Sequence, residues 1–346
     1  MTRDSFKPDD PDGSSPTGPG SVPPALPASS RPGLSTFTIE GRAAPGLFVV
    51  GWLATLMGLG LMIIGILAGS SLFFYLLGPT ILTIGLVTGA GNQALERRAR
   101  GAAYAGPSPY VVFGATISAV FAVGAAVAFG LRLFVDPSVV PAFGINLLAI
   151  AIQAIVFIAV IQVAVVGTNA LTWREMGWRP LDAVQLRHLG FGALVSVPVI
   201  ALTAVLSDLL VTVFQQVPES PLPPTGTAAG LLVQLVAGAV IAPMYEEAVF
   251  RGFAISAWER TVGPTGAIVR SSLIFALAHV IEARGDNFEQ VAGLIVIGFV
   301  TRLPVAFALG WLFVRARSIW APLGLHMAFN AILLVLAEVL LRSGAA

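Results

Sequence analysis

The chain has 346 residues, of which 56% are hydrophobic and only 11% are charged, and its mean hydropathy is +0.87. This composition excludes an ordinary soluble domain and predicts an all-α, polytopic integral membrane protein. The net charge of +1 argues against a nucleic-acid partner, and the lack of cysteine excludes disulfides, thiolate nucleophiles and cysteine-ligated metal sites.

The first 44 residues differ in composition from the rest of the chain. Residues 1–44 are rich in proline, glycine and serine, with scattered acids. Such a segment cannot bury enough apolar surface to fold, so we predict a disordered tail. No apolar run follows Met1 closely, so we expect no cleaved signal peptide and take the first apolar segment as both anchor and first span.

Nine apolar segments are candidates for crossing a bilayer, which takes about 20 residues in a helix. They lie at 47–68, 71–91, 109–134, 139–167, 189–215, 228–252, 265–281, 290–315 and 319–341. The segment at 290–315 is interrupted by Arg302 and Pro304, so it is either one helix or a short re-entrant piece followed by a helix. We therefore expect eight or nine transmembrane helices, with an N-terminal transmembrane region at 45–168 and a functional core at 189–346.

The placement of arginine predicts the orientation in the membrane. Basic residues gather in Asn92–Arg100, in Trp173–Arg187 and at Arg315 and Arg317, whereas the loop Gln215–Pro224 has none. In the nine-span count the three basic loops fall on one side, which the positive-inside rule makes cytoplasmic. The N-terminal tail would then lie in the cytoplasm. Arginine almost completely replaces lysine, and alanine and glycine are abundant, which is typical of a GC-rich bacterial gene and indicates a bacterial cell membrane.

Residues 169–188 separate the two halves of the chain. They carry Trp173 and Trp178 between arginines. Tryptophan and arginine together suit the headgroup level, so we predict an interfacial helix or elbow, with a plain cytoplasmic loop as the alternative. Charged residues within apolar segments cluster after this point.

Two adjacent glutamates, Glu246 and Glu247, stand inside a hydrophobic stretch with Arg251 behind them. A charge near the bilayer core costs roughly 2.5–3.5 kcal/mol, so these residues are expected to face a protein interior or a wet cavity. Glu247 and Arg251 are four residues apart and share one helix face, which predicts an ion pair. Glu246 points about 100° away and is left free to face a cavity.

Two of the three histidines, His279 and His326, lie in later apolar segments, and Asn330 shares a helix face with His326. A carboxylate and a histidine can deprotonate a water, while a histidine and an asparagine can donate to an oxyanion. Glu246, His279 and His326 could instead bind a divalent metal such as zinc, and the spacing does not decide between the two. Each motif alone is more often structural, but together they predict an enzyme with an intramembrane active site.

These motifs resemble those of a known family. Glu246–Arg251, Phe275–His279 and His326–Asn330 occur in the order of the three signature motifs of the CAAX protease and bacteriocin-processing (CPBP) family of intramembrane proteases. The similarity covers about residues 170–341 and includes Gly310–Pro322, ahead of the last motif. It implies an all-helical membrane fold with the site sunk in the bilayer and open to the cytosolic side.

The resemblance also implies a role for each motif residue. Glu246 and His279 would activate water, His326 and Asn330 would stabilise the oxyanion, and Glu247 and Arg251 would shape the site. We favour a metal-free mechanism, because these residues divide into a water-activating pair and an oxyanion pair without an ion; a zinc-dependent site through Glu246, His279 and His326 is the alternative.

The predicted function is that of an endopeptidase acting on a membrane-associated peptide or protein substrate, prenylated or not. Two other hypotheses compete with it. A non-catalytic immunity or scaffold protein would keep the pocket for binding, and a transporter would use it as an ion site, although no inverted repeat supports the latter. His279 lies near the end of its apolar run and His326 near the start of its own, so their helices must tilt, or the span at 265–281 must extend past Ile281, for both to reach Glu246.

Overall fold

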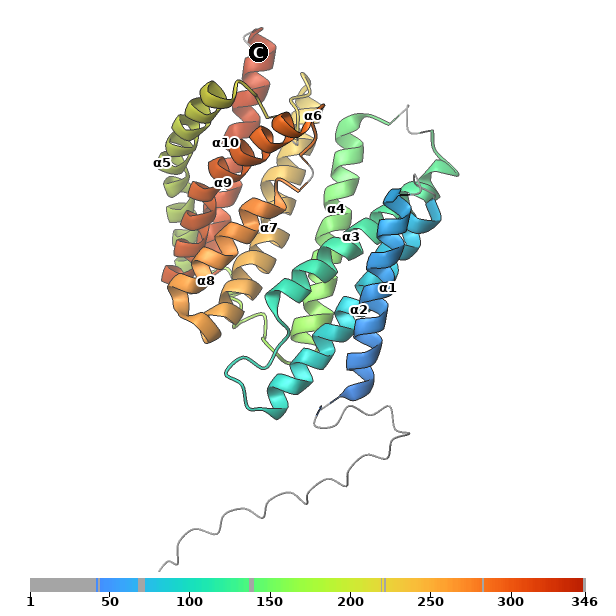
Figure 1. The fold of residues 1–346 in the computed structure, drawn as a ribbon. Coiled ribbons are helices and arrows are strands. Elements are labelled where there is room, and N and C mark those ends of the chain that lie inside the picture. The colour runs from blue at the N-terminus through green and yellow to red at the C-terminus, as the bar shows by residue number, and fades with distance from the viewer. Residues whose placement is uncertain are drawn as a thin grey trace, which may run out of the picture. The chain divides into compact units, whose positions relative to one another are not determined.

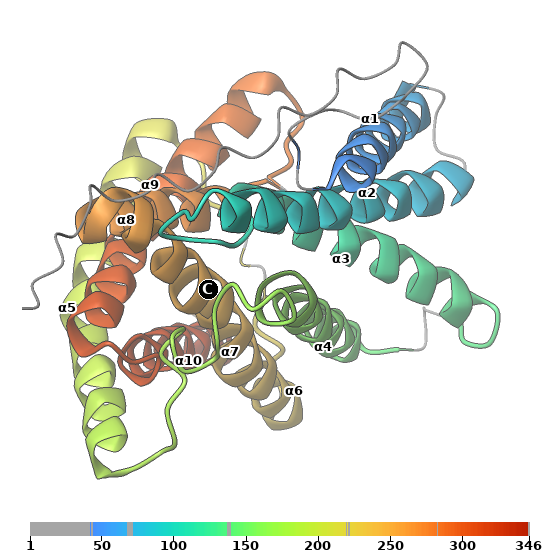
Figure 2. The same ribbon diagram turned by 90° about the horizontal axis from the view of Figure 1, so that it is seen from below.

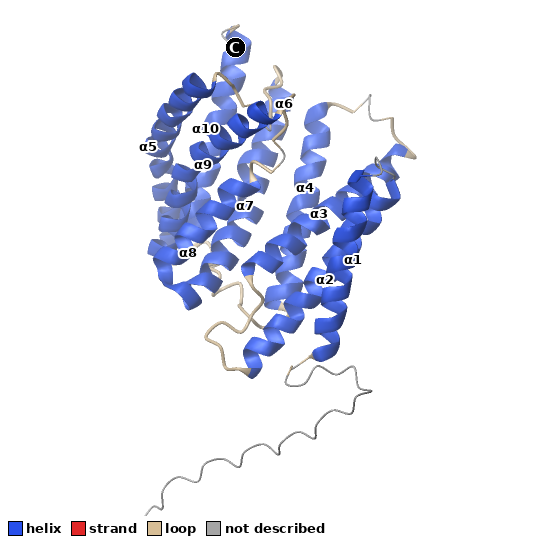
Figure 3. Ribbon diagram, in the orientation of Figure 1, coloured by secondary structure: helices blue, strands red, loops and turns tan. Residues whose placement is uncertain are grey.

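The computed structural model describes residues 42, 44–67, 72–136, 140–218, 220, 222–281 and 283–344. Within these ranges every regular element is a helix, which confirms the predicted all-α class (Figure 3). Most of the predicted N-terminal tail lies outside the described residues.

The helices follow one another along the chain with few long connections (Figure 1). They are α1 (Pro45–Leu67), α2 (Leu72–Ala99), α3 (Pro109–Arg132), α4 (Ala142–Ile161) with the π-helical η2 (Gln162–Val166), α5 (Ala183–Phe214), α6 (Ala228–Gln234), η3 (Leu235–Ile241), α7 (Ala242–Glu247), η4 (Ala248–Ile255), α8 (Ser256–Ala278), α9 (Phe288–Ala316) and α10 (Trp320–Ser343).

Eight helical stretches of the described chain are long and apolar enough to span a membrane, in line with the predicted eight or nine. One of them, Ala228–Ala278, combines two predicted segments in 51 residues. Gly263 breaks this stretch with φ 75° and ψ 172°, a conformation that a side chain would strain, and Pro264 follows it. The chain therefore reverses at Gly263, between the first part of the stretch and the rest of α8.

Of the two alternatives for residues 290–315, the structure contains the single continuous helix. Helix α9 runs without a break from Phe288 to Ala316 and contains Pro304. A proline removes one backbone donor, but neighbouring groups in a membrane protein can satisfy the freed carbonyl, so it need not end the helix. Arg302 also stays in the helix, where its guanidinium donates to the carbonyl oxygen of Gly298 at 2.9 Å.

The segment predicted to be interfacial forms turns rather than a helix over residues 169–182. Helix α5 begins at Ala183, so the non-helical segment ends at residue 182, six residues before the predicted boundary at 188. The side chain of Asp182 caps α5 by accepting from the backbone N–H groups of Val184 and Gln185. The segment is therefore not a regular helix before Ala183, and the interfacial elbow and the plain cytoplasmic loop both stay predictions; we call it the elbow below.

The elbow is fixed to the start of α10 by aromatic contacts. The ring of Trp178 packs edge-on against Trp320 with centroids 6.2 Å apart, and Trp320 Nε1 donates to the carbonyl oxygen of Arg179 at 2.9 Å. Trp173 packs edge-on against Trp178 from the other side. The elbow thus joins the first half of the chain to the helix that carries His326.

Helix packing places the segment Ala228–Ile255 between two groups of helices (Figures 1 and 2). In the first group, α1 packs on α2, α2 on α3 and α3 on α4. In the second, α5, α9 and α10 pack against one another. A Cβ on Gly192 in α5 would collide with the carbonyl oxygen of Ala321, and one on Gly324 in α10 with that of Leu189, so these helices touch backbone to backbone.

Candidate active site

Both glutamates lie on α7, which is six residues long and flanked by the π-helices η3 and η4. In η3 the N–H of Ala242 donates to the carbonyl oxygen of Ala237, five residues back. The next donor in this register would be position 243, which is a proline without an N–H. The carbonyl oxygen of Gly238 instead accepts a hydrogen bond from Asn330 Nδ2 at 2.8 Å. This irregular turn therefore fixes Asn330 of α10 beside the glutamate-bearing helix.

The predicted ion pair between Glu247 and Arg251 is confirmed. Arg251 Nη1 donates to Glu247 Oε1 at 3.0 Å, and both side chains are fully buried. The same oxygen lies 2.8 Å from Nδ1 of His326, whose side chain is 5% exposed. Since this oxygen accepts from Arg251, the contact assigns a proton to His326 Nδ1, which donates to it. Glu247 thus holds both Arg251 and His326.

Phe275 packs at the centre of these groups. Its ring lies 4.3 Å from the guanidinium carbon of Arg251, a cation–π arrangement, with centroids 4.4 Å from His279 and 5.8 Å from His326. The sequence motif ending in His279 included Phe275, but no role was predicted for it. The ring restricts where both imidazoles can turn.

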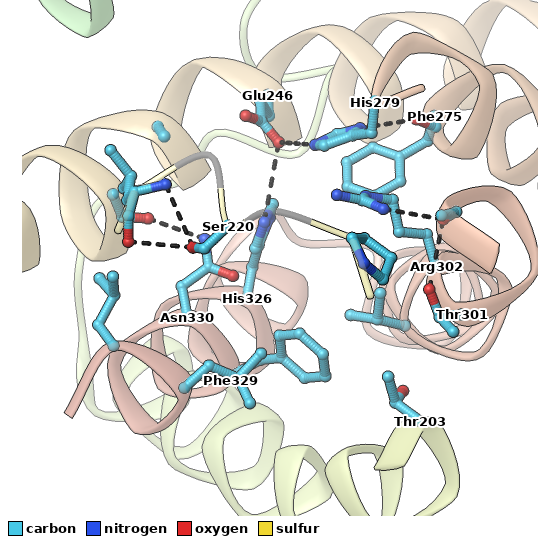
Figure 4. Close-up of a pocket in the computed structure, with 18 of the residues that line it drawn as sticks. Thr203, Ser220, Glu246, Phe275, His279, Thr301, Arg302, His326, Phe329 and Asn330 are labelled. Atoms are coloured by element: carbon cyan, nitrogen blue, oxygen red, sulfur yellow. Dashed lines mark hydrogen bonds and ion pairs between the residues drawn. The ribbon is translucent and has the colours of Figure 1, made fainter. Parts of the chain in front are cut away.

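Glu246 faces the two histidines (Figure 4). Its Oε2 lies 3.6 Å from Nε2 of His279 and 3.7 Å from Nε2 of His326. His279 caps the end of α8 and His326 lies in the first half of α10, yet both reach this oxygen without α8 extending past Ile281. The three residues that the sequence analysis selected from separate segments therefore converge.

The hydrogen bonds on the far side of each imidazole decide what Glu246 faces. His279 Nδ1 lies 2.8 Å from the carbonyl oxygen of Phe275, which can only accept, so Nδ1 carries the proton. His326 Nδ1 carries the proton toward Glu247 for the same reason. In their neutral forms both Nε2 atoms then present lone pairs to Glu246 Oε2, which is buried and has no hydrogen-bond partner in the described chain.

The carboxylate oxygen and the two Nε2 atoms, at 3.6 and 3.7 Å from it, all accept hydrogen bonds and so cannot bond to one another. A donor must therefore lie between them. A water molecule supplies two protons at such a point, and a proton on one histidine would supply another. Glu246 is 14% exposed, whereas Glu247 has no exposed surface. The geometry therefore divides the adjacent carboxylates into one that faces a cavity and one that is buried.

The cavity beside Glu246 has a volume of about 720 Å³. His279, His326 and Asn330 line it, as does Arg302, which the sequence analysis treated only as an interruption of a span. Arg302 forms no ion pair with a carboxylate of the described chain. The signal that could have identified it was the cost of a charge in an apolar helix, the same signal that drew attention to Glu246.

The first half of the chain also contributes to the cavity. Asn146 and Gln153 of α4 line it, and Tyr245 donates its hydroxyl proton to Gln153 Oε1 at 2.7 Å. Asn146 and Gln153 lie before residues 169–188, whereas the charged residues within apolar segments cluster after them. Their contribution depends on a helix packing that the sequence pattern does not reveal.

The metal alternative calls for at least three protein ligands around one ion. Glu246, His279 and His326 offer the right donor atoms, since both Nε2 lone pairs point at the carboxylate. In the part of the chain that the structure describes, however, no group of three or more His, Cys, Asp or Glu side chains is placed to hold a metal ion. We derive no step through a metal, and the zinc alternative stays a prediction.

Comparison with known families identifies one match. Residues 228–332 match the family model described as type II CAAX prenyl endopeptidase Rce1-like. No curated protein and no solved structure matches the chain. The matched residues run from the start of α6 into α10 and contain all six motif residues, so the match supports the family assignment predicted from those motifs. The predicted division into domains stays a prediction.

Proposed function

We propose that this chain, which carries a CAAX protease domain over residues 228–332, is an intramembrane endopeptidase that hydrolyses a peptide bond with a water activated by Glu246 and His279. One observation carries the proposal. Two histidines with fixed tautomers present Nε2 at 3.6 and 3.7 Å from a single buried carboxylate oxygen. A water at that point would donate to Glu246 and His279, with its own oxygen directed to the cavity.

Proton transfer in the proposed reaction begins at this water. As its oxygen attacks the peptide carbonyl carbon, Glu246 takes one proton while His279 accepts a hydrogen bond from the other, and the new C–O bond forms while the carbonyl π electrons move to oxygen. The oxyanion electrons then re-form the carbonyl, the C–N bond breaks, and the proton held by Glu246 passes to the departing amine nitrogen. General acid–base catalysis of this kind contributes typically 10²–10⁴-fold.

The oxyanion would be stabilised by Asn330 and His326. Asn330 Nδ2 has a second proton, since only one is used on the Gly238 carbonyl oxygen. Neutral His326 has no proton on Nε2, so it donates only as an imidazolium. Glu247 accepts from its Nδ1 at 2.8 Å and would stabilise that cation, as the buried carboxylate does in a hydrolytic triad. This assignment gives Glu247 a positioning role in addition to its pairing with Arg251.

The substrate that fits the proposal is a membrane-associated peptide or protein. The site lies within helices that span the membrane, so a soluble chain would have to leave water to reach it. The family model's description names a prenyl endopeptidase, which makes a prenylated peptide the first candidate. Paired reporter peptides with and without a prenyl group would measure whether the lipid contributes to KM.

The proposal is tested by replacing Glu246. Purified Glu246→Gln protein in proteoliposomes should cleave a fluorogenic reporter peptide roughly 10²-fold or more slowly than the parent. Glu259→Gln is the matched control, because Glu259 pairs with Arg317 away from the site and should leave the rate unchanged. A Glu246→Gln protein that cleaves as fast as the parent contradicts the proposal. Retention of a cellular phenotype by that variant would favour the non-catalytic immunity or scaffold function.

A further inference from the structure

We propose that the cavity opens on the extracytoplasmic side of the membrane, so that the enzyme receives substrates from outside the cytoplasm. The substrate class would be membrane-associated peptides with an extracytoplasmic segment. This side is opposite to the one implied by the family resemblance. The choice of substrate rests on the proposed function, whereas the side of access rests on the shape and charge of the molecule alone.

The site is sealed from the face that carries the basic loops. His326 lies six residues from Trp320, the first residue of α10, which is about 9 Å along the helix axis. That short route is filled by buried apolar side chains with at most 4% exposure. They are Phe250, Phe253, Ile255, Leu309, Leu312, Phe313, Ile319, Leu323 and Leu325. A close-packed interior of this kind leaves no path for water or for a peptide.

The cavity leads the other way, along the longer part of α10. Its rim includes Val217, which is 77% exposed, and Ser220, which is also exposed, in the loop that follows α5. Asn146, near the start of α4, lies on the same rim because α4 begins at the end of the molecule where α5 ends. The hollow therefore runs from Glu246 to the ends of helices farthest from the basic loops.

Polar side chains interrupt the mainly apolar walls of this route. Thr203 and Ser207 of α5 line it, and Thr203 Oγ1 is buried without a hydrogen-bond partner in the described residues. Figure 4 shows Thr203 across the cavity from Glu246. A buried hydroxyl with no protein partner requires water or a substrate group. The route is thus suited to water, which the hydrolysis consumes, and to the polar backbone of a peptide.

The distribution of arginine places the face with the cavity rim on the extracytoplasmic side. The ends of the helices on the sealed face carry Arg97, Arg98, Arg100, Arg174, Arg179, Arg187, Arg260, Arg315 and Arg317. The face with the cavity rim carries Arg132, Arg284 and Arg342 in the described chain. Cytoplasmic loops of membrane proteins carry the excess of arginine and lysine, so the sealed face is cytoplasmic.

The absence of cysteine allows a direct test by single-cysteine labelling. Ser207→Cys places a thiol on the cavity wall. Val205→Cys is its matched control, since Val205 lies two residues away on α5, is 67% exposed and does not line the cavity. Arg174→Cys reports the sealed face. Each variant is expressed in a bacterial host and treated with a membrane-impermeant maleimide, before and after permeabilisation of the inner membrane.

In intact cells, Ser207→Cys should react at least about tenfold faster than Val205→Cys, because only a hydrated thiol ionises to the reactive thiolate. Arg174→Cys should react only after permeabilisation. The proposal is overturned if Arg174→Cys reacts in intact cells, if Ser207→Cys needs permeabilisation, or if Ser207→Cys reacts no faster than Val205→Cys.

Two further variants separate misfolding and loss of activity from a wrong assignment of the side of access. If Ser207→Cys does not fold, Ser220→Cys at the rim gives the same readout. Labelling of Ser207→Cys in the Glu246→Gln background measures access without catalysis, so an inactive enzyme and a wrongly assigned side give different results.

Discussion

The buried pair of Glu247 and Arg251 gives the most quantitative prediction. Neither side chain has any exposed surface, and their closest atoms are 3.0 Å apart. Arg251→Met removes the cation and leaves the Glu247 carboxylate with His326 alone. Removing one member of a buried pair costs about 3–5 kcal/mol, because the other charge stays desolvated. That is about a fifth or more of the ~5–15 kcal/mol that stabilises a typical protein.

A double-mutant cycle separates the pair from its surroundings. Glu247→Gln keeps an oxygen for the Nδ1 proton of His326 but leaves Arg251 unpaired, so it should cost a similar amount. The double variant buries no uncompensated charge, so it should be more stable than the sum of the single effects by about 3 kcal/mol. Tryptophan fluorescence during titration with SDS in mixed micelles measures the free energy of unfolding.

Arg270→Met is the control, since Arg270 is exposed on α8 and its loss should change stability by about 0.5 kcal/mol or less. Additive single effects, or an Arg251→Met cost as small as that of Arg270→Met, would refute the reasoning. Activity gives a second readout. The double variant should still be slower than the parent by roughly 10²-fold or more, because His326 has lost the anion that stabilises its imidazolium.

Three further predictions concern packing, substrate binding and metal. Gly192→Ala should destabilise the fold by about 1–3 kcal/mol, because its Cβ collides with the Ala321 carbonyl oxygen, whereas Gly190→Ala, with nothing within 4 Å, should not; thermal unfolding distinguishes them. Arg302→Gln should raise KM for reporters with a free C-terminal carboxylate more than for amidated ones, since Arg302 is the cation lining the cavity; equal effects would exclude carboxylate binding. Activity should persist after chelation in protein shown to lack stoichiometric zinc; loss of activity restored by zinc would establish the metal-dependent alternative.

Sequence periodicity predicted the relations between residues on one helix. The four-residue spacing of Glu247 and Arg251 is local, so helix geometry alone placed them together. Hydropathy predicted the membrane helices because the bilayer sets their length. It did not predict the continuity of α9, because the cost of Pro304 depends on neighbours that composition does not specify.

For residues on different helices, the sequence predicted that their side chains meet at one site but not which contacts they make there. His326 and Glu247 are 79 positions apart, and no periodicity indicates that this histidine binds the second glutamate rather than only facing the first. The π-helices on either side of α7 also escaped prediction, because a regular 3.6-residue period was assumed throughout. Asn330 was assigned to the site from its spacing to His326, but its bond to Gly238 depends on that irregular turn.

The adjacency of the two glutamates has a physical consequence for the proposed chemistry. Consecutive positions on a helix differ by about 100°, so one side chain can be buried in the core while the next faces a cavity. Glu247 Oε1 lies 2.8 Å from Nδ1 of His326, and Nε2 of the same ring lies 3.7 Å from Glu246 Oε2. Any movement of α10 would change both distances together. The base and the imidazole that faces it are therefore positioned by one backbone turn, so the relative placement of the two groups does not depend on a flexible loop.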